Sequence, residues 1–153
     1  MIRGILLSAI ASLMLVCSLP LAAQDKGYWQ AASSNASEIT GDLSITNDKI
    51  SINFSAFPIA QIRPLKPAES SAVFDADPGA GGIGFLYRFN VPAGKRFLHK
   101  NTLCGSDDTQ WIATYVQGRA LHVAFFSGAD MPVLTPEALA NSSDVCGTFS
   151  YSR

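Results

Sequence analysis

The sequence predicts an all-β fold, mainly antiparallel, in which about eight strands form a small barrel or sandwich with one short helix and one disulfide. Three observations support this prediction. After Gln24, apolar and polar residues alternate with a period of two, which is the pattern of strands that bury one face. Turn-forming residues separate these runs at short intervals. Beyond the amino-terminal segment, the chain holds one pair of cysteines, Cys104 and Cys146.

The first 23 residues have the organisation of a cleavable signal peptide. Arg3 gives a positive start, an uncharged apolar run extends over 5–19, and Pro20 to Ala23 provide a small-residue cleavage site. The apolar run is shorter than the roughly 20 residues needed to cross a bilayer, so no membrane span is expected after cleavage. Acylation of Cys17 and an uncleaved anchor are the alternatives. The expected mature protein is a single β-rich domain, 24–153, exported to the periplasm or the extracellular space.

The segment 39–57 predicts a β-hairpin. Its turn composition lies at 46–49, and a tip at Asn47 and Asp48 would bring the apolar residues of the two runs opposite each other. All of these residues are expected on one face, turned toward the core. They are Ile39, Leu43, Ile45, Ile50, Ile52 and Phe54.

Further strands are predicted at 84–91 and 145–151, and a second hairpin joins 110–116 to 120–126. Because proline cannot donate to a central ladder, Pro58 to Pro67 is expected to form a sheet edge or an irregular crossing. Near 135–141, a capping threonine followed by proline and glutamate predicts one short helix.

Both faces of the second hairpin are apolar. One face, with Ile112, is assigned to the core. The opposite face carries four candidate binding residues: Trp111, Tyr115, His122 and Phe126. Rigid aromatic side chains give contact area at low entropic cost, so this face is a candidate surface for a protein partner. The alternative is that a second layer, such as the helix near 135–141, covers it and that His122 is a packed imidazole.

A basic cluster follows the turn at 92–94 and provides further candidate binding residues. Its members are Lys95, Arg96, His99 and Lys100. An anion or partner contact is the functional interpretation of His99. The alternative is a solvated strand edge that its charges keep from pairing.

Cys104 and Cys146 are expected to form a disulfide, because an even pair of cysteines in an exported chain becomes oxidised. On the chain-entropy model, a bridge closing a loop of this length stabilises the fold by about 4 kcal/mol. A metal pair is the alternative. Neither cysteine has another cysteine or a histidine at ligand spacing, so no metal site is predicted.

No catalytic residue and no cofactor are predicted. The chain has two histidines, no cysteine is left as a free nucleophile, and its paired aspartates lie among turn residues rather than across a cleft. The glycine string at 79–84 lacks the following helix that a dinucleotide site needs. The mature chain loses only Arg3 of the 11 basic residues and keeps all 12 acidic ones, so nucleic acid is not an expected partner.

Gly27 and Trp29 open the mature chain as a Gly-x-Trp motif. It is similar to the Gly-x-Trp of lipocalins, whose tryptophan packs at the closed end of an eight-stranded barrel holding a small apolar ligand. The function favoured by the residues is a non-enzymatic exported binding domain that engages a protein partner, as an inhibitor or an assembly subunit. A lipocalin-like carrier of a small apolar ligand is the first alternative, and an envelope hydrolase is the second.

Overall fold

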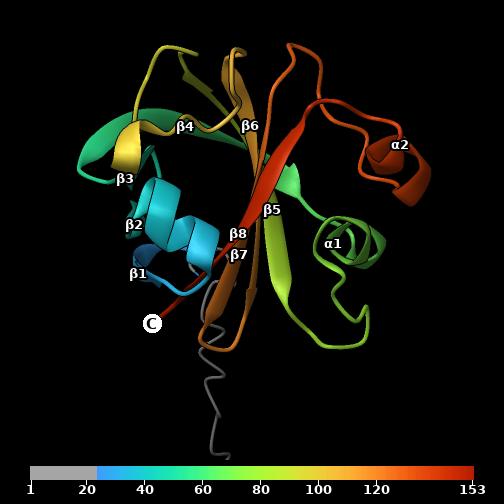
Figure 1. The fold of residues 1–153 in the computed structure, drawn as a ribbon. Helices are drawn as coiled ribbons and strands as arrows, with labels where there is room; N and C mark the ends of the chain where they lie inside the picture. The colour runs from blue at the N-terminus through green and yellow to red at the C-terminus, as the bar shows by residue number, and fades with distance from the viewer. Residues whose placement is uncertain (1–23) are drawn as a thin grey trace, which may run out of the picture.

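The computed structural model describes residues 24–153, and the predicted signal peptide, 1–23, lies outside the described residues. Eight antiparallel strands form a closed barrel, in which each strand pairs with the next and β8 returns to pair with β1 (Figure 1). Of the two predicted architectures, the structure is therefore the barrel. The strands are β1 (Gly27–Ala31), β2 (Leu43–Ile45), β3 (Lys49–Ile52), β4 (Ser55–Pro64), β5 (Ile83–Val91), β6 (Thr109–Gln117), β7 (Ala120–Phe126) and β8 (Val145–Ser152).

Both predicted hairpins have the register that their apolar residues require. In the first, Ile45 pairs with Ile50 across the predicted tip. In the second, Trp111 pairs with Phe126, and the pairing continues without a shift to the turn. Because a slip of one residue would move every side chain to the other face, these registers determine which residues enter the barrel.

Side chains from all eight strands fill the interior of the barrel. Trp29, Tyr87, Phe125 and Tyr151 are among its largest completely buried members. The rings of Phe125 and Phe149 pack edge to face, with centroids 5.3 Å apart. Burial of a large apolar side chain stabilises a fold by about 1.5–3 kcal/mol, so this cluster is the main source of the stability of the barrel.

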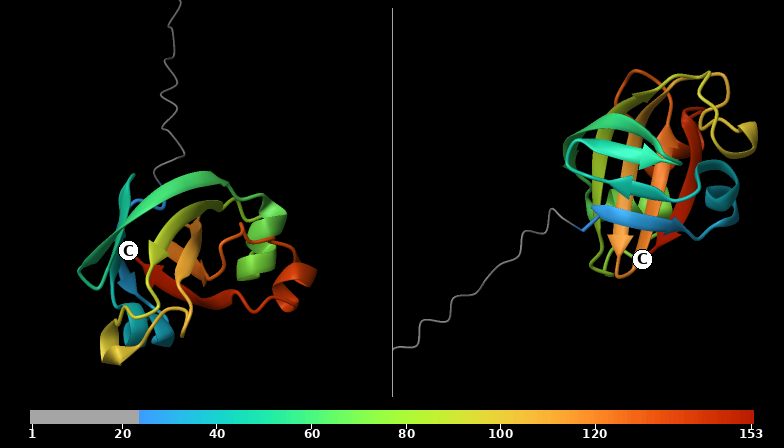
Figure 2. Two further views of the ribbon diagram at one scale, coloured as in Figure 1. Left: turned by 90° about the horizontal axis from the view of Figure 1, so that it is seen from above. Right: turned by 90° about the vertical axis from the view of Figure 1, so that its left-hand side faces the viewer.

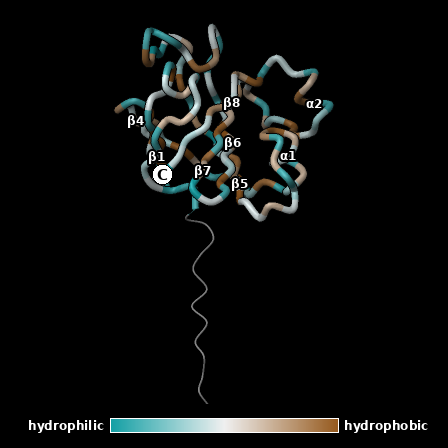
Figure 3. Tube along the Cα trace, turned by 60° about the horizontal axis from the view of Figure 1, so that its bottom comes forward, coloured by the Kyte–Doolittle hydropathy of each residue, from teal (hydrophilic) through white to brown (hydrophobic). Residues whose placement is uncertain are grey.

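A second layer covers the outer face of β5, β6 and β7. It consists of α1 (Pro67–Phe74), α2 (Pro136–Ala140) and the chain that precedes α2 (Figures 1 and 2). Figure 3 shows many hydrophobic residues along these strands. Both apolar faces of the second hairpin are thus used for packing. The buried members between the layer and the barrel are Leu65, Leu86, Trp111, Ala113, Ala124, Phe126 and Leu134.

The helix predicted near 135–141 is α2. Thr135 Oγ1 accepts a hydrogen bond from the backbone nitrogen of Ala138 at 3.3 Å, and Pro136 occupies the first helical position. The prediction of a single helix missed α1, in which Glu69 accepts a hydrogen bond from the backbone nitrogen of Lys66 at 2.9 Å. Within residues 24–153, no helix is long and apolar enough to cross a bilayer.

Two segments differ from their prediction. Ile39 lies in a single π-helical turn, η2 (Ala36–Thr40), rather than in a strand, so β2 is shorter than expected. The segment 58–67, expected to be an edge or an irregular crossing, lies mostly within β4. Pro58 is the last residue of β4 that pairs with β3, and Pro64 is the last that pairs with β5. The next backbone nitrogens, of Ile59 and Leu65, still donate to the carbonyls of Asp48 and Gly84, at 2.9 and 2.8 Å, so the missing donor of each proline points away from these ladders.

Candidate binding site

The aromatic residues predicted to form a binding face lie beneath the second layer. Trp111, Tyr115 and Phe126 are 6%, 3% and 1% exposed. Trp111 Nε1 donates to the carbonyl of Gly128 at 3.1 Å, and the ring of Phe74, from α1, stacks 6.1 Å from that of Tyr115. The expectation that these side chains are exposed for a partner is wrong, because helical coverage removes their apolar surface from water.

His122 is half-buried beside this layer. Its Nδ1 lies 3.0 Å from Ser150 Oγ, and its ring packs near those of Phe74 and Tyr115. Burial lowers the pKa of the imidazole, which favours the neutral form. Among the ion pairs of residues 24–153, none involves His122, so no carboxylate orients it as in a catalytic triad.

The basic cluster lies on the opposite side of the barrel from α1 and α2 (Figures 1 and 2). It belongs to the loop between β5 and β6, which includes the short turn η3 (Leu98–Lys100). His99 lies in this turn rather than on the expected strand edge, and its Nε2 is 3.4 Å from a carboxylate oxygen of Glu38. The structure therefore keeps the two predicted sets of binding residues apart.

Cys104 and Cys146 form the predicted disulfide, with their sulfur atoms 2.01 Å apart. The bond joins the loop that precedes β6 to the start of β8, across 42 residues of sequence. Among residues 24–153, no group of three or more histidine, cysteine, aspartate or glutamate side chains is placed to hold a metal ion.

A pocket of about 350 Å³, which the sequence did not indicate, lies on the outer face of β1, β2 and β3. Tyr28 pairs with Ser44, and Ser44 pairs with Ser51, so these three outward residues form a row across the strands. The two serines are small, whereas Tyr28 is 58% exposed and Phe54, at the turn after β3, is completely exposed. We call this the Tyr28–Phe54 pocket. Its lining residues are Tyr28, Asp42, Leu43, Ser44, Ser51, Asn53 and Phe54.

Phe54 occupies an unusual position for an aromatic residue. Ile52 pairs with Ser55, which leaves Asn53 and Phe54 as a two-residue turn with φ values of 45° and 67°. Glycine is preferred at the second position of such turns, and a left-handed conformation costs another residue about 1–2 kcal/mol. The prediction that Phe54 shares the core face with Ile50 is wrong, because the turn moves it off the strand. The turn-forming Asn53 is the sequence signal for this position.

Asp42 gives the pocket a negative charge. Its Oδ2 accepts a hydrogen bond from the Tyr28 hydroxyl, and its Oδ1 accepts one from the backbone nitrogen of Ala31 at 2.8 Å. These two bonds, first that from Tyr28, lower the pKa of the Asp42 carboxyl. The same carboxylate raises the pKa of the Tyr28 hydroxyl through its hydrogen bond. At neutral pH the pair is therefore a carboxylate and a neutral phenol.

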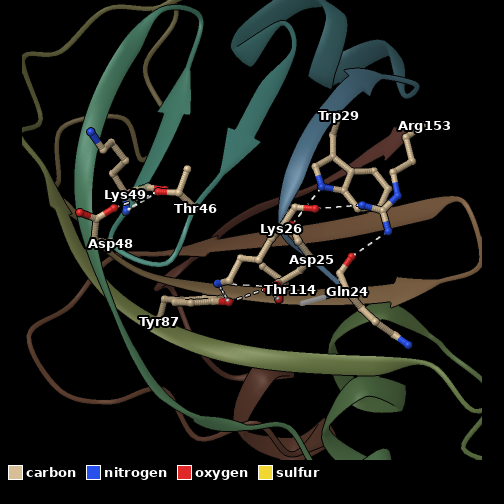
Figure 4. A network of polar contacts seen from close by, with 10 residues as sticks. All are labelled: Gln24, Asp25, Lys26, Trp29, Thr46, Asp48, Lys49, Tyr87, Thr114 and Arg153. Carbon is tan, nitrogen blue, oxygen red and sulfur yellow. Dashed lines mark hydrogen bonds and ion pairs between the residues drawn. The ribbon is translucent and has the colours of Figure 1, made fainter. Parts of the chain in front are cut away.

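A second carboxylate, Asp25, is completely buried where the chain enters β1 (Figure 4). Its Oδ2 accepts hydrogen bonds from the Tyr87 hydroxyl at 2.5 Å and from Thr114 Oγ1 at 3.0 Å. Lys26 Nζ lies 2.8 Å from the Tyr87 oxygen and 3.6 Å from Asp25 Oδ1. Burial, and then the bond to Asp25, raise the pKa of the Tyr87 hydroxyl. This network holds the entry of the chain against β5 and β6.

Arg153 joins the carboxyl end of the chain to the same network (Figure 4). Its guanidinium lies 4.1 Å over the ring of Trp29. It also donates hydrogen bonds to the carbonyl oxygens of Lys26 at 2.9 Å and of Gln24 at 3.1 Å. The two ends of the described chain are thus held together at one end of the barrel.

Comparison with protein-family models, with curated proteins and with solved structures finds no match to this chain.

Proposed function

We propose that this chain is a non-enzymatic exported binding domain that engages a protein partner through the Tyr28–Phe54 pocket, as an inhibitor or an assembly subunit. The disulfide between Cys104 and Cys146 and the filled interior give the barrel a rigid frame. A rigid frame loses little conformational entropy when it binds, which favours affinity from a small contact area.

The observation that carries this proposal is the position of Phe54. Its ring is completely exposed, and its backbone is in a conformation that glycine adopts more easily. Within residues 24–153, neither an aromatic pair nor a cation–π contact involves it. A strained residue that gains so little from the fold is a feature of functional sites, and exposed aromatic residues are enriched among the anchors of protein interfaces.

The substitution Phe54→Gly separates binding from stability. We expect the free energy of unfolding to rise by about 1 kcal/mol, because glycine relieves the left-handed strain. We expect retention of the partner to fall by about tenfold or more, since loss of an anchor costs an interface about 2 kcal/mol or more. Immobilised wild type and variant, exposed to extracts of the producing organism, are compared by quantitative mass spectrometry and by urea unfolding.

Val133→Ala is the matched control, because Val133 is also exposed but lies in the segment before α2, away from the pocket. It should retain the same proteins as the wild type. Equal recovery by Phe54→Gly and wild type would contradict the proposal. A loss of stability in Phe54→Gly would contradict the assignment of strain to this turn.

A carrier of a small apolar ligand is the second candidate. The closed eight-stranded barrel and the position of Trp29 at the network of Figure 4 favour it. Phe85, Tyr87 and Phe89 already contribute to the filled interior, which favours the partner function instead. Native mass spectrometry of protein purified from its own source tests the carrier function, since a carrier would be recovered with a lipophilic adduct.

A further inference from the structure

We propose that the Tyr28–Phe54 pocket receives a cationic side chain of the partner protein, with the cation against the Asp42 carboxylate and between the two aromatic rings. This inference rests on the proposed function, because it names the group that the partner supplies. The carboxylate would neutralise the cation, the rings would contact its faces, and the serine hydroxyls would accept its remaining hydrogen bonds.

The charge of the pocket has no internal counterion. Asp42 is the only charged residue among the lining residues. Within residues 24–153, none of the ion pairs includes it. Its carboxylate accepts two hydrogen bonds, from Tyr28 and Ala31, whereas a carboxylate has about four acceptor positions. Asp42 can therefore accept charge-assisted hydrogen bonds from a donor that enters the pocket.

The aromatic residues complement a cation as well. The hydrogen bond to Asp42 holds the Tyr28 ring beside the carboxylate, and Phe54 stands at the neighbouring turn. The face of an aromatic ring attracts ammonium and guanidinium groups. Ser44 and Ser51 add hydroxyl groups for the remaining donors of the cation. A volume of about 350 Å³ lies at the low end of the range for small-ligand pockets, which fits a single side chain.

A second tyrosine–carboxylate pair, at the buried end of the barrel, already has a cation beside it. We call Asp25, Tyr87 and Lys26 the buried unit, and Asp42 with Tyr28 the exposed unit. In the buried unit, the Tyr87 hydroxyl donates to Asp25, as Tyr28 does to Asp42. Lys26 completes the buried unit, with Nζ 4.7 Å from the centroid of the Tyr87 ring and 3.6 Å from the carboxylate. The exposed unit has the tyrosine and the carboxylate but lacks the cation. A partner lysine or arginine would occupy the corresponding position.

Titration with small probes tests this inference directly. The probes are Nα-acetyl-argininamide, Nα-acetyl-lysinamide and the neutral Nα-acetyl-citrullinamide, added to ¹⁵N-labelled protein at low ionic strength, where the attraction is least screened. We expect the cationic probes to shift the amide signals of Tyr28, Asp42 and Asn53, and citrulline to leave them unchanged. A larger effect of arginine than of lysine would identify a guanidinium as the preferred cation.

Asp42→Asn is the decisive variant, because it removes the charge at nearly constant shape. The amide oxygen can still accept from the backbone nitrogen of Ala31, and the amide nitrogen can donate to the Tyr28 oxygen. We expect the variant to weaken binding of the cationic probes about tenfold or more. Asp48→Asn, at the exposed tip between β2 and β3, is the matched control and should bind as the wild type does. Equal shifts with citrulline, equal binding by Asp42→Asn, or no shifts at the solubility limit of the cationic probes would overturn the inference.

The partner experiment keeps the two proposals distinguishable. If Phe54→Gly loses its partner while Asp42→Asn retains it fully, the partner function stands and the cationic anchor is wrong. If the cationic probes bind but no protein is retained by the wild type, the pocket is a cation site and the partner function is wrong.

Discussion

Two carboxylates of this barrel each accept a hydrogen bond from a tyrosine hydroxyl, but their surroundings differ. Asp25 is completely buried and is completed by Thr114 and Lys26, whereas Asp42 faces solvent without an internal cation. Inside the barrel, a low dielectric makes each missing partner costly. Asp25 Oδ1 accepts no hydrogen bond from residues 24–153, and the Lys26 ammonium, 3.6 Å away, compensates its charge. At the surface, water replaces a missing partner, so an incomplete unit persists and remains available for binding. Burial thus determines whether the same pair of side chains is enclosed within the fold or remains accessible at the surface.

The largest expected difference between the two units comes from removing the carboxylates. Asp25→Ala leaves the Tyr87 and Thr114 hydroxyls and the Lys26 ammonium without their common acceptor, and breaking a buried pair costs about 3–5 kcal/mol. Asp42→Ala should cost less than about 1 kcal/mol, because water solvates the groups it leaves. Urea unfolding followed by tryptophan fluorescence measures both changes. Similar losses of unfolding free energy in Asp25→Ala and Asp42→Ala would show that burial does not determine how much each carboxylate stabilises the fold.

Removing the hydroxyls sharpens the comparison. Tyr87→Phe takes one donor from buried Asp25 and should lower the free energy of unfolding by about 1–3 kcal/mol. Tyr28→Phe should lower it far less, because the Tyr28 hydroxyl is exposed. It should instead raise the pKa of Asp42 toward the ordinary value, since the largest cause of its lowering is lost. Carbon-detected NMR titration of the carboxyl group measures this pKa, and an unchanged value would contradict the assigned cause.

Arg153→Met tests whether the buried unit depends on the contact between the chain ends. The variant loses the contact with the Trp29 ring and the hydrogen bonds to the carbonyls of Gln24 and Lys26, with an expected loss of about 1–2 kcal/mol. Arg96→Met, in the exposed basic loop, is the control and should change stability little. Thermal unfolding of both variants and the wild type measures the effect. A melting temperature of Arg153→Met equal to that of Arg96→Met would contradict the expected loss.

The smallest expected effect is the pH dependence of the exposed unit. The folded pKa of Asp42 is lowered, so its contribution is present above about pH 4 and is lost as the pH falls through the folded pKa. The folded pKa of Tyr28 is raised, so its contribution is present below about pH 10 and is lost as the pH rises through the folded pKa. The stability difference between wild type and Tyr28→Phe should therefore shrink at both extremes. A difference independent of pH would contradict this linkage.

The parts of the fold that follow from local patterning were predictable from the sequence. The two hairpins are confirmed because alternation determines which residues face the core, and α2 is confirmed because Thr135 and Pro136 form a standard helix start. The helix α1 was missed because its serines leave it almost no apolar periodicity and because Lys66, rather than a capping residue such as threonine, precedes Pro67. The candidate aromatic face was misplaced for the same reason, since α1 is part of the layer that covers it.

The candidate site was not predictable from periodicity. Phe54 continues the alternation of Ile50 and Ile52 in the sequence, but the two-residue turn reverses the chain before it can enter the core. Tyr28 and Asp42 lie in different parts of the chain and meet only because β1 pairs with β2. The buried unit is equally hidden, since Tyr87 and Thr114 are 62 and 89 residues from Asp25. Contacts between residues this far apart in sequence arise from strand pairing in the folded barrel and leave no local pattern in the sequence.

The closure of the barrel also limits how a partner can approach. In the described chain, each of the eight strands has a hydrogen-bonded neighbour on both sides along part of its length, whereas 60–64 in β4 and 145–149 in β8 pair with a neighbouring strand on one side only. Because these stretches are short, the barrel offers a partner no long open edge to extend with a strand of its own, which is the recognition mode of many open sheets. The same closure leaves little strand edge for edge-to-edge aggregation. Side chains carried on turns are more accessible than the strand backbone, and the ring of Phe54 is one of them.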